Sequence, residues 1–161
     1  MSNSKILVIG IDGGTFDIIK PMIEKGRLPN LASIMRDGIS GELISTIPFL
    51  TSTAFTSFMT GVNPGKHRIF GFTSNSHVQY DDGSILNASH IGTETIWDIL
   101  YKNKKRVLLV VVPFTYPPPK MNGAMIYTDV YSKGRIYTYP PGLQEDIRKV
   151  IGPYKTMPKV R

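Results

Sequence analysis

Two polar residues, Asp12 and Thr51, stand where a side chain can do chemistry. Asp12 follows the apolar run 5–11 (KILVIGI), which has the length and composition of a strand buried on both faces. A carboxylate at the end of such a strand lies at the edge where open α/β sheets place their ligand sites. Thr51 supplies a hydroxyl at the head of a predicted helix, 51–60. A metal-binding carboxylate and a hydroxyl at a helix N-terminus together indicate hydrolysis through an activated alkoxide.

Both residues also have an ordinary structural explanation. Asp12 can cap the helix that follows it, and Thr51, Ser52 or Thr53 can be the N-cap of the predicted helix, since Asp, Ser and Thr are common helix caps. The glycines around Asp12 do not match a dinucleotide-binding loop, because the second glycine of G-x-G-x-x-G would fall at position 12. They do let the backbone pass close to a bound cation. Capping and metal binding therefore both stay open for Asp12.

The elements around these residues predict an α/β fold with a largely parallel sheet. Apolar residues recur with helical spacing in several segments besides 51–60, so we expect further helices over 16–25, 28–38, 93–102 and 144–151. Short apolar runs bounded by turn residues predict strands over 5–11, 41–47, 106–112 and 124–128. Asp81-Asp82-Gly83 is a predicted hairpin turn.

Composition narrows the classes of protein. A chain of 161 residues with 41% hydrophobic content can bury one sizeable core, so we expect one domain. No apolar run approaches the roughly 18 residues of a membrane-spanning helix, and the N-terminus lacks the features of a signal peptide. We therefore expect a cytoplasmic protein with no membrane partner. The absence of cysteine excludes disulfides, thiolate metal sites and a cysteine nucleophile.

The net charge of +7 is concentrated in two basic clusters, 102–106 and 148–161. Nucleic-acid binding is one interpretation of such clusters. No aromatic residues are interleaved with the charges, so we favour a helix C-terminus for the first cluster and a solvated tail for the second. His67 is a weak candidate for a functional role, while His77 and His90 lack ligand spacing to another acid or histidine.

Six motifs, in this order, resemble the type I phosphodiesterase and nucleotide pyrophosphatase family of the alkaline phosphatase superfamily. They are Ile9-Gly-Ile-Asp12-Gly-Gly14, Gly26-Arg-Leu-Pro-Asn-Leu31, Ser45-Thr-Ile-Pro48, Thr51-x4-Thr56-Ser-Phe-Met-Thr60-Gly61, Asn63-Pro-Gly-Lys-His67 and Val112-Pro-Phe-Thr-Tyr-Pro-Pro118. The similarity runs in register over nearly the whole chain. It implies an alkaline-phosphatase-like three-layer αβα sandwich, of which residues 1–161 would form the N-terminal part.

The resemblance also implies a mechanism. In this family two metal ions, typically zinc, with manganese or magnesium as alternatives, flank a threonine that attacks phosphorus and forms a covalent phospho-threonine intermediate. Position in the motifs assigns the nucleophile to Thr51, which would also contact metal. It assigns the metal-binding aspartate to Asp12. Ser52 and Thr53 fit the register less well. The implied substrate is a small phosphoric ester, and paired cations would stabilise the attacking and leaving oxygens.

The sequence departs from the family pattern near these residues. Relatives often carry prolines just after the nucleophile, where this chain has Ser52 and Thr53. Relatives commonly have His-Gly where this chain has His67-Arg68. In the nucleotide-cleaving branch an asparagine contacts phosphate at the position of Phe72, which argues against a nucleotide substrate.

Length is the largest departure. Family members usually continue well past this point, and their remaining metal ligands lie in that later portion. Here His90, Asp98 and Asp129 match no ligand motif, and a catalytic zinc takes about three protein ligands. We therefore expect a hydrolase whose second metal site needs a complementary C-terminal chain or a homo-oligomer. The alternative is a naturally truncated, catalytically silent domain that acts as a subunit or binding module.

Overall fold

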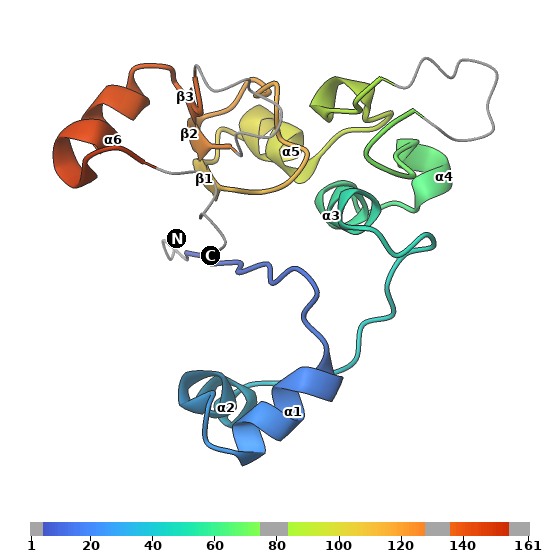
Figure 1. Cartoon of the computed structure of the whole chain (residues 1–161). Coiled ribbons are helices and arrows are strands. Elements are labelled where there is room, and N and C mark those ends of the chain that lie inside the picture. Colours follow the sequence, from blue (N-terminus) through green and yellow to red (C-terminus); the bar gives the residue numbers. More distant parts are fainter. Residues whose placement is uncertain (1–4, 75–83, 128–135, 155–161) are drawn as a thin grey trace. The chain divides into compact units, whose positions relative to one another are not determined.

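The computed structural model describes residues 5–74, 84–127 and 136–154. The chain forms two compact units, Met1–Ile44 and Ser45–Arg161. Figure 1 labels the helices and strands of both, and each unit is described by itself below.

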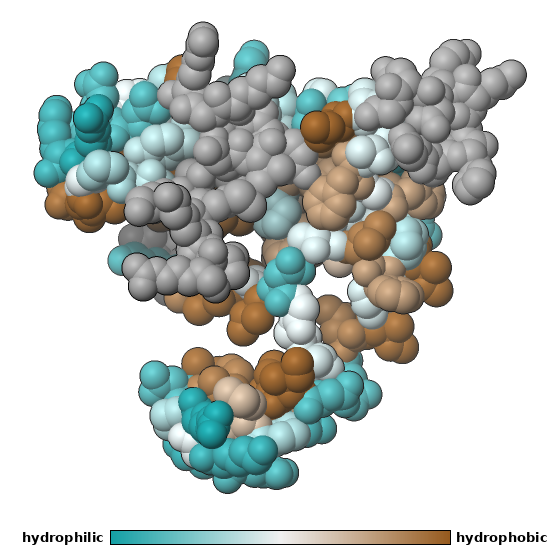
Figure 2. All heavy atoms as spheres, in the orientation of Figure 1, coloured by the Kyte–Doolittle hydropathy of each residue, from teal (hydrophilic) through white to brown (hydrophobic). Residues whose placement is uncertain are grey.

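The first unit contains two helices, α1 (Phe16–Glu24) and α2 (Pro29–Asp37), which pack against each other. Thr15 is the N-cap of α1, and its hydroxyl accepts a hydrogen bond from the backbone N–H of Asp17 (3.3 Å). Pro29 opens α2 because a proline at this position loses no intrahelical bond. Over these helices the apolar side chains gather on one side and the polar ones on the other (Figure 2). Both predicted helices are confirmed.

The predicted strand over 5–11 is wrong. This segment pairs with no strand in the described part of the chain, and its apolar side chains are exposed, Ile6 by 90%. The predicted strand over 41–47 is wrong for the same reason, with Leu43 exposed by 96%. A strand forms only when its backbone groups bond to a neighbour, and an apolar composition does not supply that neighbour.

The second unit holds the remaining elements. They are α3 (Thr51–Thr60), α4 (Pro64–His67), the 3₁₀ helix η1 (Ala88–His90), α5 (Ile96–Lys102), β1 (Val107–Val110), β2 (Gly123–Ile126), β3 (Thr138–Tyr139) and α6 (Leu143–Ile151). β1 and β2 are parallel, with Val107 opposite Gly123, and β3 is antiparallel to β2. The described residues thus form an α/β fold with a three-stranded mixed sheet. The three-layer sandwich stays a prediction.

Local signals explain where most of these elements begin and end. α3 ends at Gly61, whose φ of +68° is a left-handed conformation that glycine adopts without steric cost. α5 begins at Ile96 and not at the predicted position 93, because Thr95 is its N-cap. The Thr95 backbone N–H and hydroxyl both donate to Asp98 Oδ2 at 2.7 Å. α4, η1 and β3 were not predicted, and each is four residues or shorter.

The predicted hairpin turn at 81–83 lies outside the described residues, while the segments 72–74 and 84–86 pair with each other. The Leu86 N–H donates to the Phe72 carbonyl, and the Ser74 N–H donates to the Ser84 carbonyl, both at 2.9 Å. An isolated antiparallel bridge joins Thr73 to Ile85.

A small apolar core fixes α3, α5 and the sheet. Its buried side chains are Met59, Ile69, Trp97, Leu109, Phe114, Met121, Met125 and Tyr127. Met59 anchors α3, with 1% of its surface exposed, and each such burial stabilises the fold by about 1.5–3 kcal/mol. Phe55 of α3 also packs against this core, so the helix that begins at Thr51 is held by two of its side chains.

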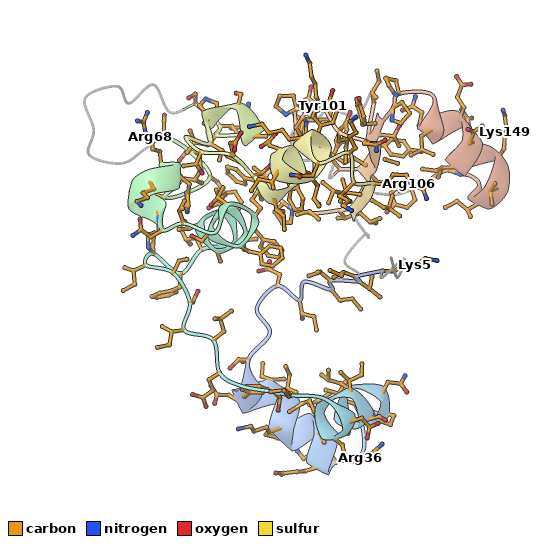
Figure 3. All side chains as sticks on the ribbon, turned by 180° about the vertical axis from the view of Figure 1, so that it is seen from behind. Lys5, Arg36, Arg68, Tyr101, Arg106 and Lys149 are labelled. Carbon is orange, nitrogen blue, oxygen red and sulfur yellow. The ribbon has the colours of Figure 1, made fainter. Side chains whose placement is uncertain are left out.

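The first basic cluster follows the end of a helix, whereas most of the predicted solvated tail, with Lys155, Lys159 and Arg161, lies outside the described residues. α5 ends at Lys102, so the cluster 102–106 follows its C-terminus, and the Lys102 ammonium pairs with Glu94. Arg148 and Lys149 stand in the last turn of α6, and Figure 3 labels Arg106, which directly precedes β1, and Lys149. No helix among the described residues is long and apolar enough to cross a membrane.

Candidate functional site

Asp12 lies in a tight turn that precedes α1. The Gly14 N–H donates to the Ile11 carbonyl (3.3 Å), and Gly13 has a φ of +65°, which a side chain at that position would strain. Asp12 is exposed, and the N-cap position of α1 belongs to Thr15. The N-cap of α1 is therefore Thr15 and not Asp12.

Thr51 is the first residue of α3 and is half-buried. The N-cap is Leu50, in an extended conformation (φ −118°, ψ 148°), and it caps the helix with no side-chain hydrogen bond. The prediction that Thr51, Ser52 or Thr53 is the N-cap is therefore wrong. The Thr51 hydroxyl stands at the positive end of the helix, where backbone N–H groups lack intrahelical acceptors and stabilise a nearby negative charge.

Burial separates Thr51 from the two hydroxyl residues that follow it. Ser52 and Thr53 are fully buried, and neither hydroxyl has a hydrogen-bond partner among the described residues. Thr56 is also buried, and its hydroxyl donates to the Ser52 carbonyl (2.6 Å). A nucleophile must reach its substrate, so within 51–53 the burial pattern favours Thr51.

His67 is a buried structural residue. Its Nδ1 accepts a hydrogen bond from the Ile69 N–H (3.1 Å), which leaves the proton of the neutral ring on Nε2, and Nε2 lies 2.8 Å from Ser57 Oγ. Burial lowers the pKa of His67 below its ordinary value of 6.5. A backbone hydrogen bond raises the pKa, but by less than burial lowers it. Nε2 thus joins α4 to α3 and Nδ1 holds the backbone that follows α4, so neither nitrogen can bind a metal without breaking a hydrogen bond.

No local pattern points to Ser57 as a partner of His67, because it is ten residues away and on a different helix. His90 is used locally, because its Nδ1 accepts from the Asn87 N–H (3.1 Å) and closes the cap of η1. His77 lies outside the described residues.

Two departures from the family pattern have a structural role here. Arg68 is the C-cap of α4 and adopts the left-handed conformation (φ 68°, ψ 14°), which explains why glycine suits this position. The labelled Arg68 in Figure 3 follows α4 directly. Phe72 packs its ring against Phe114, with 6.0 Å between ring centroids, so it serves an aromatic contact.

The described residues do not by themselves fit a two-metal centre. Within 5–74, 84–127 and 136–154, no group of three or more histidine, aspartate or glutamate side chains is placed to hold a metal ion. Four further candidates, His77, Asp81, Asp82 and Asp129, lie outside these ranges. Asp12 belongs to the first unit and Thr51 to the second, so the structure describes each only within its own unit.

Comparison with known proteins gives one result. A family model described as type I phosphodiesterase / nucleotide pyrophosphatase matches residues 6–157 of the 161. No curated protein and no solved structure matches.

Proposed function

This chain belongs to the type I phosphodiesterase / nucleotide pyrophosphatase family, and from that premise we propose that it hydrolyses phosphoric esters with Thr51 as its nucleophile. The family suggests phosphodiesterase or pyrophosphatase activity. The observation that carries the choice of residue is the position of Thr51. It is the first residue of α3 and is half-buried, whereas Ser52 and Thr53 beside it are fully buried.

The proposed step is displacement at phosphorus. Thr51 Oγ forms a bond to phosphorus, the bond from phosphorus to the leaving alkoxide breaks, and the hydroxyl proton passes to solvent. Water then cleaves the phospho-threonine ester and restores the hydroxyl. The N-terminus of α3 favours both the alkoxide and the attached phosphate, because its backbone N–H groups point outward and the helix dipole is positive there.

Asp12 is the proposed metal ligand of this chain. It is exposed on a turn, and the N-cap of α1 is Thr15. The family generally uses divalent metals, which lower the pKa of a bound hydroxyl. Zinc is the ion that we expect, with manganese or magnesium as alternatives. Further ligands would come from residues outside those described, from a second copy or from a complementary chain.

The experiment compares two neighbouring hydroxyls. Turnover of bis-p-nitrophenyl phosphate is measured with added zinc or manganese for the unaltered protein and for Thr51→Ala and Ser52→Ala. Removing a nucleophile costs several orders of magnitude in rate, so Thr51→Ala should lose at least about a thousandfold. Ser52→Ala removes a buried hydroxyl without a partner and should keep activity within about threefold. Equal turnover by Thr51→Ala and the unaltered protein would refute the assignment.

The second candidate function is a catalytically silent domain that acts as a subunit or binding module. The observation that favours it is the lack of a three-ligand group among the described residues, together with exposed apolar side chains such as Ile6 and Leu43. This hypothesis predicts no turnover by the unaltered protein with either metal. Clear metal-dependent turnover would exclude it.

A further inference from the structure

A pocket of about 290 Å³ lies within the second unit, and α3 contributes none of its lining. Its walls come from two segments, 88–98 and 114–119. These segments are also joined by a backbone hydrogen bond from the Ala88 N–H to the Tyr116 carbonyl (2.8 Å). The pocket is thus a feature of the folded core, separate from the residues proposed for catalysis.

Most of the pocket wall is apolar and rigid. Trp97 and Phe114 line it and are 6% and 2% exposed, so the core holds both rings in place. The run Pro117–Pro118–Pro119 lines it as well, and proline has a fixed φ. A wall of this kind suits the apolar body of a small molecule and loses little entropy when one binds.

Asp98 gives the pocket its charge. Both the N–H and the hydroxyl of Thr95 donate to Asp98 Oδ2 at 2.7 Å, which fixes the carboxylate in the first turn of α5. Within the described residues Oδ1 takes part in no hydrogen bond or ion pair, and the side chain is only half-buried. No lysine or arginine lines the pocket, and the nearby Lys102 ammonium pairs with Glu94.

Thr93 adds an unused hydrogen-bonding group. It lines the same pocket, and its hydroxyl oxygen is buried with no partner in the described part of the chain. An unpaired buried hydroxyl costs free energy, which a rotation about χ1 toward a polar ligand group would recover. A broader surface hollow adjoins the pocket through Ile91, Thr93, Asp98 and Pro119 and offers a route of entry. Its charged lining comprises Lys120, Asp98 and the Lys102–Glu94 ion pair.

We propose that this pocket binds a small organic ammonium ion. The apolar body of the ligand lies against Trp97, Phe114 and the three prolines, and its ammonium group donates to Asp98 Oδ1 and to the turned Thr93 hydroxyl. A cation is favoured because the lining holds one carboxylate and no basic side chain. An anionic ligand, including the phosphoric-ester substrate, is disfavoured at this site for the same reason.

Trp97 provides the readout, because it is the single tryptophan of the chain and lines the pocket. Benzylamine is the probe, and benzyl alcohol is the neutral comparator with the same ring. Benzylamine should change the fluorescence saturably with a Kd of about 1 mM or lower. Its affinity should exceed that of benzyl alcohol by at least about tenfold, because hydrogen bonds to a charged group are roughly twice as strong as neutral ones.

Two matched variants identify the carboxylate. Asp98→Asn keeps the shape and the acceptor for Thr95 but removes the charge, so benzylamine and benzyl alcohol should bind it within about twofold of each other. Glu145→Gln removes the same charge from an exposed residue of α6, outside the lining of both the pocket and the adjoining hollow, and should keep the preference for benzylamine.

Three results would overturn the proposal. They are equal affinity of the unaltered protein for the amine and the alcohol, no saturation at about ten times the expected Kd, and an equal loss of preference in Glu145→Gln and Asp98→Asn. If Asp98→Asn does not fold, the comparison of the two probes on the unaltered protein still decides.

Discussion

Mild acid should destabilise the second unit through one residue, His67. The ring is fully buried, and burial lowers its pKa below the ordinary value of 6.5. The unfolded chain therefore binds more protons than the folded chain at pH values between the lowered pKa and 6.5. The stability that His67 contributes is complete above about pH 6.5 and is lost as the pH falls through this window.

The hydrogen bonds explain why the neutral ring is preferred. Nδ1 accepts a hydrogen bond from the Ile69 N–H at 3.1 Å. Protonation of Nδ1 would turn this acceptor into a donor, so two N–H groups would face each other and the hydrogen bond would be lost. A single proton changes the free energy of unfolding by at most about 1.4 kcal/mol per pH unit. For a chain of 161 residues each kcal/mol corresponds to a shift in Tm of about 2–4 °C.

Urea unfolding followed by Trp97 fluorescence measures this effect between about pH 5 and pH 8. The unaltered protein should lose stability towards acid, and His67→Gln should lose much less because its side chain does not titrate. His90→Gln is the control, since His90 is exposed, and it should keep the acid dependence of the unaltered protein. The same slope in His67→Gln and the unaltered protein, or loss of the slope in His90→Gln, would refute this reasoning.

Two further predictions concern the same region. Ser57→Ala removes the acceptor for the His67 Nε2–H and should lower the free energy of unfolding by about 1–3 kcal/mol in urea, while Ser57→Thr, which keeps a hydroxyl, should lose less. A loss within about 0.5 kcal/mol for Ser57→Ala would show that the hydrogen bond is unimportant. Arg68→Gly removes the strain of a side chain in the left-handed conformation, which stabilises the folded state by about 1–2 kcal/mol. The greater backbone freedom of glycine in the unfolded chain lowers this gain by about 0.5–1 kcal/mol. A net rise in Tm is therefore expected for Arg68→Gly but not for Arg68→Ala, and equal Tm values for the two variants would contradict the explanation.

The helices could be predicted because their signals are local. Thr15 caps α1, Pro29 opens α2 and Gly61 closes α3, and each of these residues acts within one turn of the helix that it bounds. Of the predicted strands, 106–112 and 124–128 are confirmed as β1 and β2, which pair with each other. The segment 5–11 has an equally apolar sequence but no partner among the described residues, and a sequence pattern does not reveal whether a partner exists.

The candidate site could be predicted only in part. The motifs single out Asp12 and Thr51. The burial of Ser52 and Thr53, which favours Thr51 over its two neighbours as the nucleophile, can be seen only in the folded structure. The contact between Ser57 and His67 joins two helices through the tertiary fold, so no local pattern predicts it. The pocket beside Trp97 likewise depends on two distant segments meeting.

The claim that Thr51 is the nucleophile is tested most directly by trapping the covalent intermediate. The protein is mixed with bis-p-nitrophenyl phosphate and zinc or manganese, quenched with acid during turnover, and digested for peptide mass spectrometry. One nitrophenolate leaves and the other stays on phosphorus, so we predict a p-nitrophenylphosphoryl adduct on Thr51, which should be absent from Thr51→Ala. Turnover with the adduct on Ser52 or Thr53, or turnover with no adduct at all, would contradict this account.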